Sequence, residues 1–88
     1  MEELSYKDAL IEIRESYASV TDNNDIINWY NKYLSTIKYI LAIDAEIISD
    51  INDESKIEFA RACGIITTVK INQLIVKFEA NHMHLVDN

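Results

Sequence analysis

Apolar residues recur along the chain at the three- and four-residue spacings of amphipathic helices. The first such row consists of Tyr6, Leu10, Ile13, Tyr17 and Val20. Ser5 stands before the row as a candidate N-cap, with the acidic Asp8 three residues later. We therefore predict a helix over residues 5–20.

A second and longer row follows the polar cluster at residues 21–24. It consists of Ile27, Tyr30, Leu34, Ile37, Leu41, Asp44, Ile48 and Ile51, of which only Asp44 is charged. The unbroken spacing predicts one helix over residues 25–51, about 40 Å long at 1.5 Å per residue. A neighbouring row that contains Trp29 widens the apolar face, so this helix should contact more than one neighbour.

A third row begins after the polar residues 52–54. Ser55 opens a capping box there, and the spacing predicts a helix over residues 55–85. Because residues 65–78 are rich in β-branched side chains, a β-hairpin turning at residues 72–73 is the alternative. That turn lacks the glycine that two-residue hairpin loops favour, so helix is the preferred interpretation.

Turn-forming residues are scarce, since the chain has no proline and one glycine. A sandwich or barrel needs turn signals every few residues, which excludes those folds. We predict a single all-α domain over residues 1–88, a long antiparallel helical hairpin with a shorter N-terminal helix. The alternative is an α+β fold with a C-terminal β-hairpin. The antiparallel register places Asp44 beside Arg61, a candidate ion pair that would explain the charged core position.

The predicted first helix is too short to cover the hairpin tip, residues 42–64. Isoleucines and acidic residues are concentrated in this region. An uncovered apolar patch usually marks a docking surface. Trp29 is a further candidate, because tryptophan is frequent at interface hot spots. The candidate partner-binding residues are Ile43, Ile47, Ile48, Ile51, Asp50, Asp53, Glu54 and Trp29.

Charge and targeting patterns narrow the partner classes. The net charge of −7 disfavours nucleic acids and anionic membranes, which bind basic surfaces. The N-terminus has no signal-peptide pattern, and the longest uninterrupted apolar run, Tyr39–Ile43, is far shorter than a membrane span. We expect a cytoplasmic protein without a membrane partner. The frequent Ile, Asn, Lys and Tyr are typical of an AT-rich coding source such as a phage or mobile element.

Catalytic and metal-binding motifs are weak. Cys63 is the only cysteine, which excludes an intramolecular disulfide and a cysteine zinc site. Residues 50–54 resemble the start of a calcium loop, but Ser55 and Arg61 occupy the positions of its glycine and its bidentate glutamate. His82 and His84 diverge on a helix and cannot share a metal there. We expect no enzymatic activity, no cofactor and no metal.

These observations favour a non-enzymatic, acidic, helical module that binds proteins. It would act as an inhibitor or adaptor that self-associates and covers a partner surface, with opposite charge guiding the encounter. One alternative is an assembly or secretion-type chaperone, or a structural subunit, that holds another helix in its groove. A second alternative is an oligomer that sequesters a small ligand.

Overall fold

The computed structural model describes the backbone of residues 2–87 and the side chains of residues 6–80. This part of the chain contains the helices α1 (Glu2–Ala18), α2 (Asn23–Lys32), α3 (Leu34–Leu41) and α4 (Glu54–Asp87). Residues 42–53 form an irregular connection between α3 and α4. Because residues 2–87 contain no strand, the all-α prediction is confirmed, and the β-hairpin alternative is wrong.

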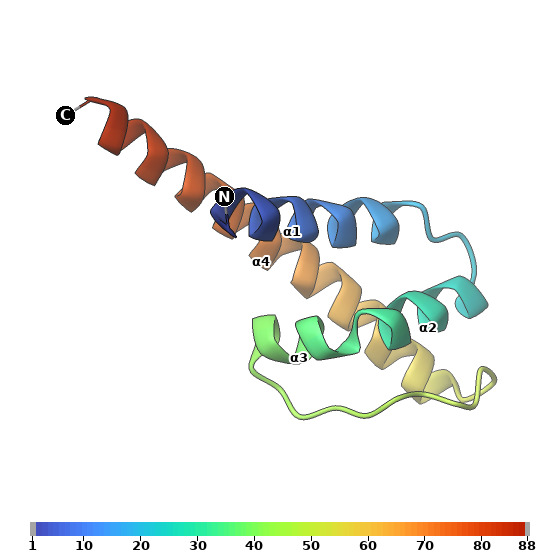
Figure 1. Ribbon diagram of the computed structural model, residues 1–88. Coiled ribbons are helices and arrows are strands. Elements are labelled where there is room, and N and C mark those ends of the chain that lie inside the picture. The colour runs from blue at the N-terminus through green and yellow to red at the C-terminus, as the bar shows by residue number, and fades with distance from the viewer. Residues whose placement is uncertain (1, 88) are drawn as a thin grey trace.

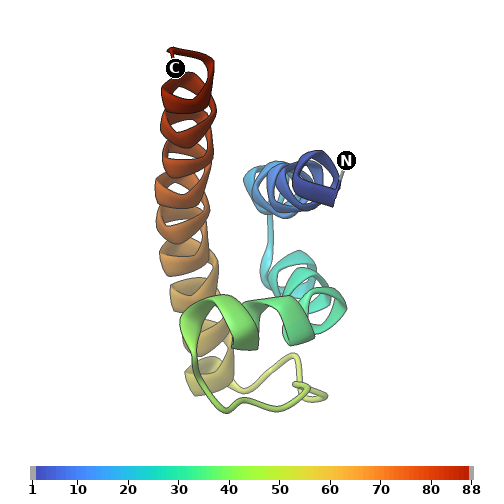
Figure 2. The same ribbon diagram turned by 60° about the vertical axis from the view of Figure 1, so that its left-hand side comes forward.

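The long helix α4 is the element on which the others pack. It contacts α1, α2 and α3; in Figure 2, α1 and α2 lie to one side of it, and the end of α3 passes in front of its first half. α1 crosses the middle of α4, while α2, α3 and the irregular connection lie beside its first half (Figure 1). The last turns of α4 extend beyond the other helices (Figure 1), and the molecule measures 54 × 25 × 19 Å. This elongation follows from the 34 residues of α4, which span about 51 Å.

The core lies between α4 and the helices that pack on it. Its buried apolar residues are Leu10, Ile13, Ile26, Ile27, Trp29, Tyr30, Ile37, Ile48, Ile57, Ala60, Cys63, Ile71 and Ile75. On α4 the buried positions recur at helical spacing, so one face of this helix packs in the core. α4 begins one residue before Ser55, close to its predicted start. Ser5, the predicted cap of the first helix, lies inside α1 instead.

The predicted helix over residues 25–51 is wrong, and with it the long helical hairpin. The chain bends at Tyr33, where φ is −105° and ψ is 17°, and the helix ends at Leu41. Ala42 adopts the left-handed conformation with φ 54°, which costs a non-glycine residue about 1 kcal/mol. The cost is offset by two cap bonds, from Ala42 N to Tyr39 O and from Ile43 N to Lys38 O.

The predicted ion pair between Asp44 and Arg61 is not formed. Asp44 lies on the irregular connection, fully exposed, with its carboxylate 3.9 Å from Lys38 Nζ. Arg61 donates a hydrogen bond of 3.0 Å from Nη2 to Asn23 Oδ1, and its Nε lies 3.9 Å from Glu58. The register that paired the two residues assumed a helix through residues 42–51, and that helix is absent.

Candidate functional site

The predicted hairpin tip is not an uncovered helix face. The irregular connection folds back against α2 and the start of α4, and buries Ile48 to 5% exposure. Ile43 is half-buried, whereas Ile47 and Ile51 are exposed. Ile48 therefore belongs to the core rather than to a docking surface, and the four isoleucines do not form one contiguous patch.

Side chains of α2 hold the irregular connection in place. Asn31 bonds the backbone of Ile48 twice: Nδ2 donates to the carbonyl at 2.8 Å, and Oδ1 accepts from the amide at 2.9 Å. The Tyr30 hydroxyl donates to the carbonyl of Glu46 at 2.9 Å. Burial raises the pKa of Tyr30, and the nearby Cys63 and Glu46 raise it further. Tyr30 thus stays a neutral donor, and the connection is fixed at two consecutive α2 residues.

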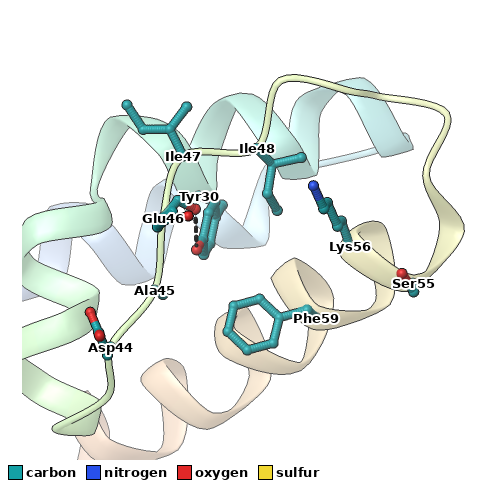
Figure 3. A pocket seen from close by; sticks show the side chains of 9 residues that line it. All are labelled: Tyr30, Asp44, Ala45, Glu46, Ile47, Ile48, Ser55, Lys56 and Phe59. Carbon is teal, nitrogen blue, oxygen red and sulfur yellow. Dashed lines mark hydrogen bonds between the residues drawn. The ribbon is translucent and has the colours of Figure 1, made fainter.

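A hollow of about 400 Å³ lies between this connection and the start of α4 (Figure 3). Its lining residues are Tyr30, Asp44, Ala45, Glu46, Ile47, Ile48, Ser55, Lys56 and Phe59. Figure 3 shows Ile48 directed inward, towards Phe59, and Ile47 on the opposite side of the extended segment. The hollow is open and of mixed polarity, and its lining does not form a nucleophile–base pair or a carboxylate dyad.

The predicted acidic residues of the tip have local roles in turns and caps. Asp50 Oδ1 accepts from the backbone amide of Asn52 at 2.9 Å. Asp53 caps α4, because its Oδ1 accepts from the Ser55 amide at 3.1 Å and from the Ser55 hydroxyl at 2.7 Å. Glu54 lies in the first turn of α4, where a negative charge stabilises the helix dipole. These carboxylates stabilise the start of α4.

The capping role of Asp53 predicts a pH-dependent effect of Asp53→Ala. The Ser55 hydroxyl, followed by the Lys56 amide, lowers the pKa of Asp53, so folding favours its ionised form. The stabilisation is present above the ordinary aspartate pKa of about 3.9 and is lost as the pH falls through the lowered value. We expect the variant to unfold at a lower temperature than wild type at pH 7, and the difference to shrink at pH 3. Asp44→Ala, which removes a fully exposed carboxylate, is the control. A difference of equal size at both pH values would contradict the assignment.

Trp29 is a core residue. It is 5% exposed, and its Nε1 donates to the carbonyl of Ile13 at 3.1 Å. Its ring packs against Tyr17 at 4.9 Å and against Tyr33 at 6.1 Å between centroids. The prediction that Trp29 offers an anchor to a partner is not supported, because the indole joins α1 to α2.

Exposed apolar side chains gather instead on one face of α4. We call this face the outer row. It consists of Phe59, Ala62, Ile66, Val69, Gln73 and Val76, at successive spacings of 3, 4, 3, 4 and 3 residues. Its four large apolar side chains are between 42 and 65% exposed, and Ile65 beside them is 55% exposed. Their spacing is visible in the sequence, but the row of core positions predicted for this segment covers only the opposite face.

The outer row and the core face lie on opposite sides of α4. Positions in a helix advance by about 100° per residue, so Phe59 is rotated by about 200° from the buried Ile57. The same offset separates Ile66 from Gly64 and Val69 from Thr67, both buried. Two members of the row lie close to other helices: the Phe59 ring contacts the Tyr30 ring of α2, with centroids 6.0 Å apart, and Gln73 lines a groove with Ile40 of α3. Ile66 and Val69 in the middle of the outer row, and Val76 near its end, are therefore the large apolar side chains that α4 exposes on this second face.

α4 also has the length and composition of a membrane-spanning helix. Its segment Glu54–Ala80 contains an 18-residue window with a mean hydropathy of 1.2, of which 28% is buried. Charged and polar residues interrupt the segment, so the length of uninterrupted apolar runs does not reveal it. A core helix of a soluble protein passes the same test, and the inner face of α4 does pack in the core.

Reactive and metal-binding groups do not form a site in the described residues. Cys63 is 3% exposed, and burial raises the pKa of its thiol, so the unreactive neutral form is favoured. Among these residues no three His, Cys, Asp or Glu side chains are grouped to hold a metal ion. The side chains of His82 and His84 lie outside the described residues. Comparisons with protein-family models, curated proteins and solved structures find no match to this chain.

Proposed function

We propose that this chain is a non-enzymatic protein-binding module whose docking surface is the outer row of α4. The observation that supports the proposal is the concentration of exposed apolar side chains on the face of α4 that points away from the core. Monomeric proteins seldom expose contiguous apolar patches larger than a few hundred Å², and larger patches mark interaction sites. A helix presenting such a row binds another helix or a groove through residues spaced three and four apart.

The charge distribution is suited to this role. Residues 54–80 carry four basic and three acidic side chains, whereas residues 2–53 carry eleven acidic and four basic ones. The excess negative charge therefore lies on the helices and connection that pack against the other side of α4. It keeps that surface hydrated and soluble, and leaves the nearly neutral outer row free for apolar contact. In this proposal the module acts as an adaptor or inhibitor by covering an apolar surface of its partner.

Site-specific photocrosslinking in living cells tests the proposal. A benzophenone side chain is placed at the position of Val69, in the centre of the outer row, and in a control at the position of Ile47. Both native side chains are exposed, but Ile47 lies on the irregular connection. We expect light-dependent protein adducts from position 69 at least ten times more abundant than from position 47. Equal yields, or adducts with lipid only, would refute the proposed docking surface.

A further inference from the structure

We infer that the outer row binds a second copy of this chain, with the two α4 helices parallel and in register. This inference rests on the proposed function and specifies its partner. The first observation is the seven-residue period. Phe59, Ile66 and Gln73 occupy one repeating position, and Ala62, Val69 and Val76 another, three and four residues apart in alternation. Helices with this period pack in a supercoiled pair.

The core face of α4 has the same period on the opposite side. Ile57, Gly64 and Ile71 are buried at intervals of seven residues, as are Ala60 and Thr67. In a coiled coil these are the outward positions, farthest from the seam between the helices. A second α4 on the outer row would leave this core face covered as it is, and would adjoin α2 at Phe59 and α3 at Gln73. The two copies would have their remaining helices on the outside of the pair.

Gln73 indicates the direction of the second helix. It is the one polar member of the outer row, and it is exposed. In an antiparallel pair its amide would face the partner's Ala62 or the partner's Val69 and lose its hydrogen bonds with water. In a parallel, in-register pair it faces the partner's Gln73, and each amide offers the other both a donor and an acceptor. A single polar residue in such a seam commonly specifies register.

The charged residues beside the outer row also disfavour an antiparallel pair. The flank that includes Lys56, Lys70 and Lys77 carries only basic charges, because Cys63 occupies its remaining position. Antiparallel helices place this flank opposite the same flank of the partner. In the antiparallel register that packs Phe59 on the partner's Val76, Lys56 lies beside the partner's Lys77. If one helix is shifted by seven residues in either direction, two lysines again lie side by side.

A parallel pair avoids these repulsive contacts. In a parallel pair, each residue on the flank of Glu58 contacts a residue on the lysine flank of the partner. The contacted residue lies five positions later in the sequence. Lys70 meets the partner's Ile65, and Lys77 meets the partner's Asn72. Glu58 faces the position of the partner's Cys63, whose side chain is buried in its own core, so none of these contacts joins like charges. The charge pattern and Gln73 thus agree on the same orientation.

A membrane fits the outer row less well than a second copy. Lys70 and Lys77 flank the row near Val69 and Val76, and a bilayer around these residues would have to accommodate both ammonium groups. At the edge of a helix pair the same lysines remain in water. The strongly negative remainder of the chain would also be repelled by an anionic lipid surface.

Sedimentation velocity over a range of protein concentrations tests the association. We expect wild type to reach the mass of two copies at micromolar concentrations, and Ile66→Glu to weaken association at least tenfold. The new carboxylate lies one turn before Lys70, a favourable spacing that preserves the helix. Ile47→Glu makes the same chemical change off the row and should associate like wild type. Circular dichroism confirms that both variants are folded. A wild type that stays monomeric, or equal association of both variants, overturns the inference.

Disulfide crosslinking tests the orientation. Gln73→Cys is made in a Cys63→Ala background, and Ile47→Cys in the same background is the control. Under mild oxidation Gln73→Cys should give a covalent dimer in high yield, because a parallel, in-register pair places the two thiols across the seam. A yield no higher than that of the control overturns the parallel arrangement. A mixture of Ala62→Cys and Gln73→Cys chains that crosslinks preferentially would identify the antiparallel one.

The crosslinking and sedimentation results together distinguish the second-copy inference from the proposed protein-binding function. A photoadduct from position 69 with the mass of two copies supports both the inference and the proposed function. An adduct with a different protein, together with a monomeric wild type, overturns the second copy and preserves the protein-binding module. Flotation with vesicles of phosphatidylcholine and phosphatidylglycerol tests the membrane alternative. Vesicle binding that Ile66→Glu abolishes, without protein adducts, overturns both proposals.

Discussion

Gly64→Ala is expected to lower the free energy of unfolding by about 2 kcal/mol, a typical cost of overpacking. Gly64 lies in the middle of α4, where alanine would ordinarily be favoured by about 1 kcal/mol. A Cβ at this position would overlap the Tyr17 ring, and would lie 2.6 Å from its Cδ1. The ring has little room to move, because it packs on Trp29 and its hydroxyl donates to the carbonyl of Arg61 at 3.4 Å. Urea unfolding monitored by circular dichroism measures the difference.

A double-mutant cycle with Tyr17→Ala isolates this contact. Once the ring is removed, Gly64→Ala should be neutral or stabilising by up to about 1 kcal/mol, since only its effect on helix propensity remains. The sign of the effect therefore depends on the residue at position 17. If Gly64→Ala stabilises the wild-type chain, the close packing of α1 on α4 at this point is wrong.

Asn31→Ala is expected to destabilise the fold by about 2 kcal/mol, because each of its two hydrogen bonds to Ile48 contributes about 1 kcal/mol. The change also leaves the amide and carbonyl of Ile48 without the partners that Asn31 supplies. The irregular connection should then detach from α2 more often. Chemical denaturation measures the stability, and hydrogen exchange at the Ile48 amide measures the local opening.

Asn28→Ala is the matched control for this variant. Asn28 is exposed on the same helix, so its replacement measures the gain in helix propensity alone. We expect Asn28→Ala to change stability by less than about 0.5 kcal/mol and to leave exchange at Ile48 unchanged. Equal exchange at Ile48 in both variants would show that Asn31 does not hold the connection.

The two faces of α4 should respond differently to substitution. Replacing Gly64 acts on the core face and changes the stability of the monomer. Ile66 is 48% exposed and does not belong to the core, so its replacement should leave the monomer close to its wild-type stability. A loss of association in Ile66→Glu can therefore be attributed to the surface rather than to unfolding.

Local sequence patterns were sufficient to locate α1 and α4. In both helices the apolar spacing continues over many turns, and polar residues mark where the preceding connection ends. The capping role of Asp53 in place of Ser55 shifts the start of α4 by one residue only. Scarce turn residues also indicated the all-α class, because helices need few sharp turns.

The same patterns misplaced the end of the second helix. Ile48 continues the apolar spacing beyond Leu41, but it reaches the core from an extended segment. The bonds that make this possible come from Asn31, 17 residues away, and spacing carries no information on such a contact. The predicted tip and the Asp44–Arg61 pair both depended on that continued helix or on its register, whereas the predicted interface role of Trp29 depended on its residue type alone.

The sequence by itself determined which residues share a face of a helix, since a period near 3.6 residues follows from backbone geometry. It contained both apolar rows of α4 and the seven-residue period of each. Only the tertiary structure decided that α1, α2 and α3 cover Ile57, Gly64 and Ile71, and that Ile66 and Val69 remain exposed. The physical reason is that burial depends on which surfaces meet, and apolar residues on either face of a helix would gain equally from being covered.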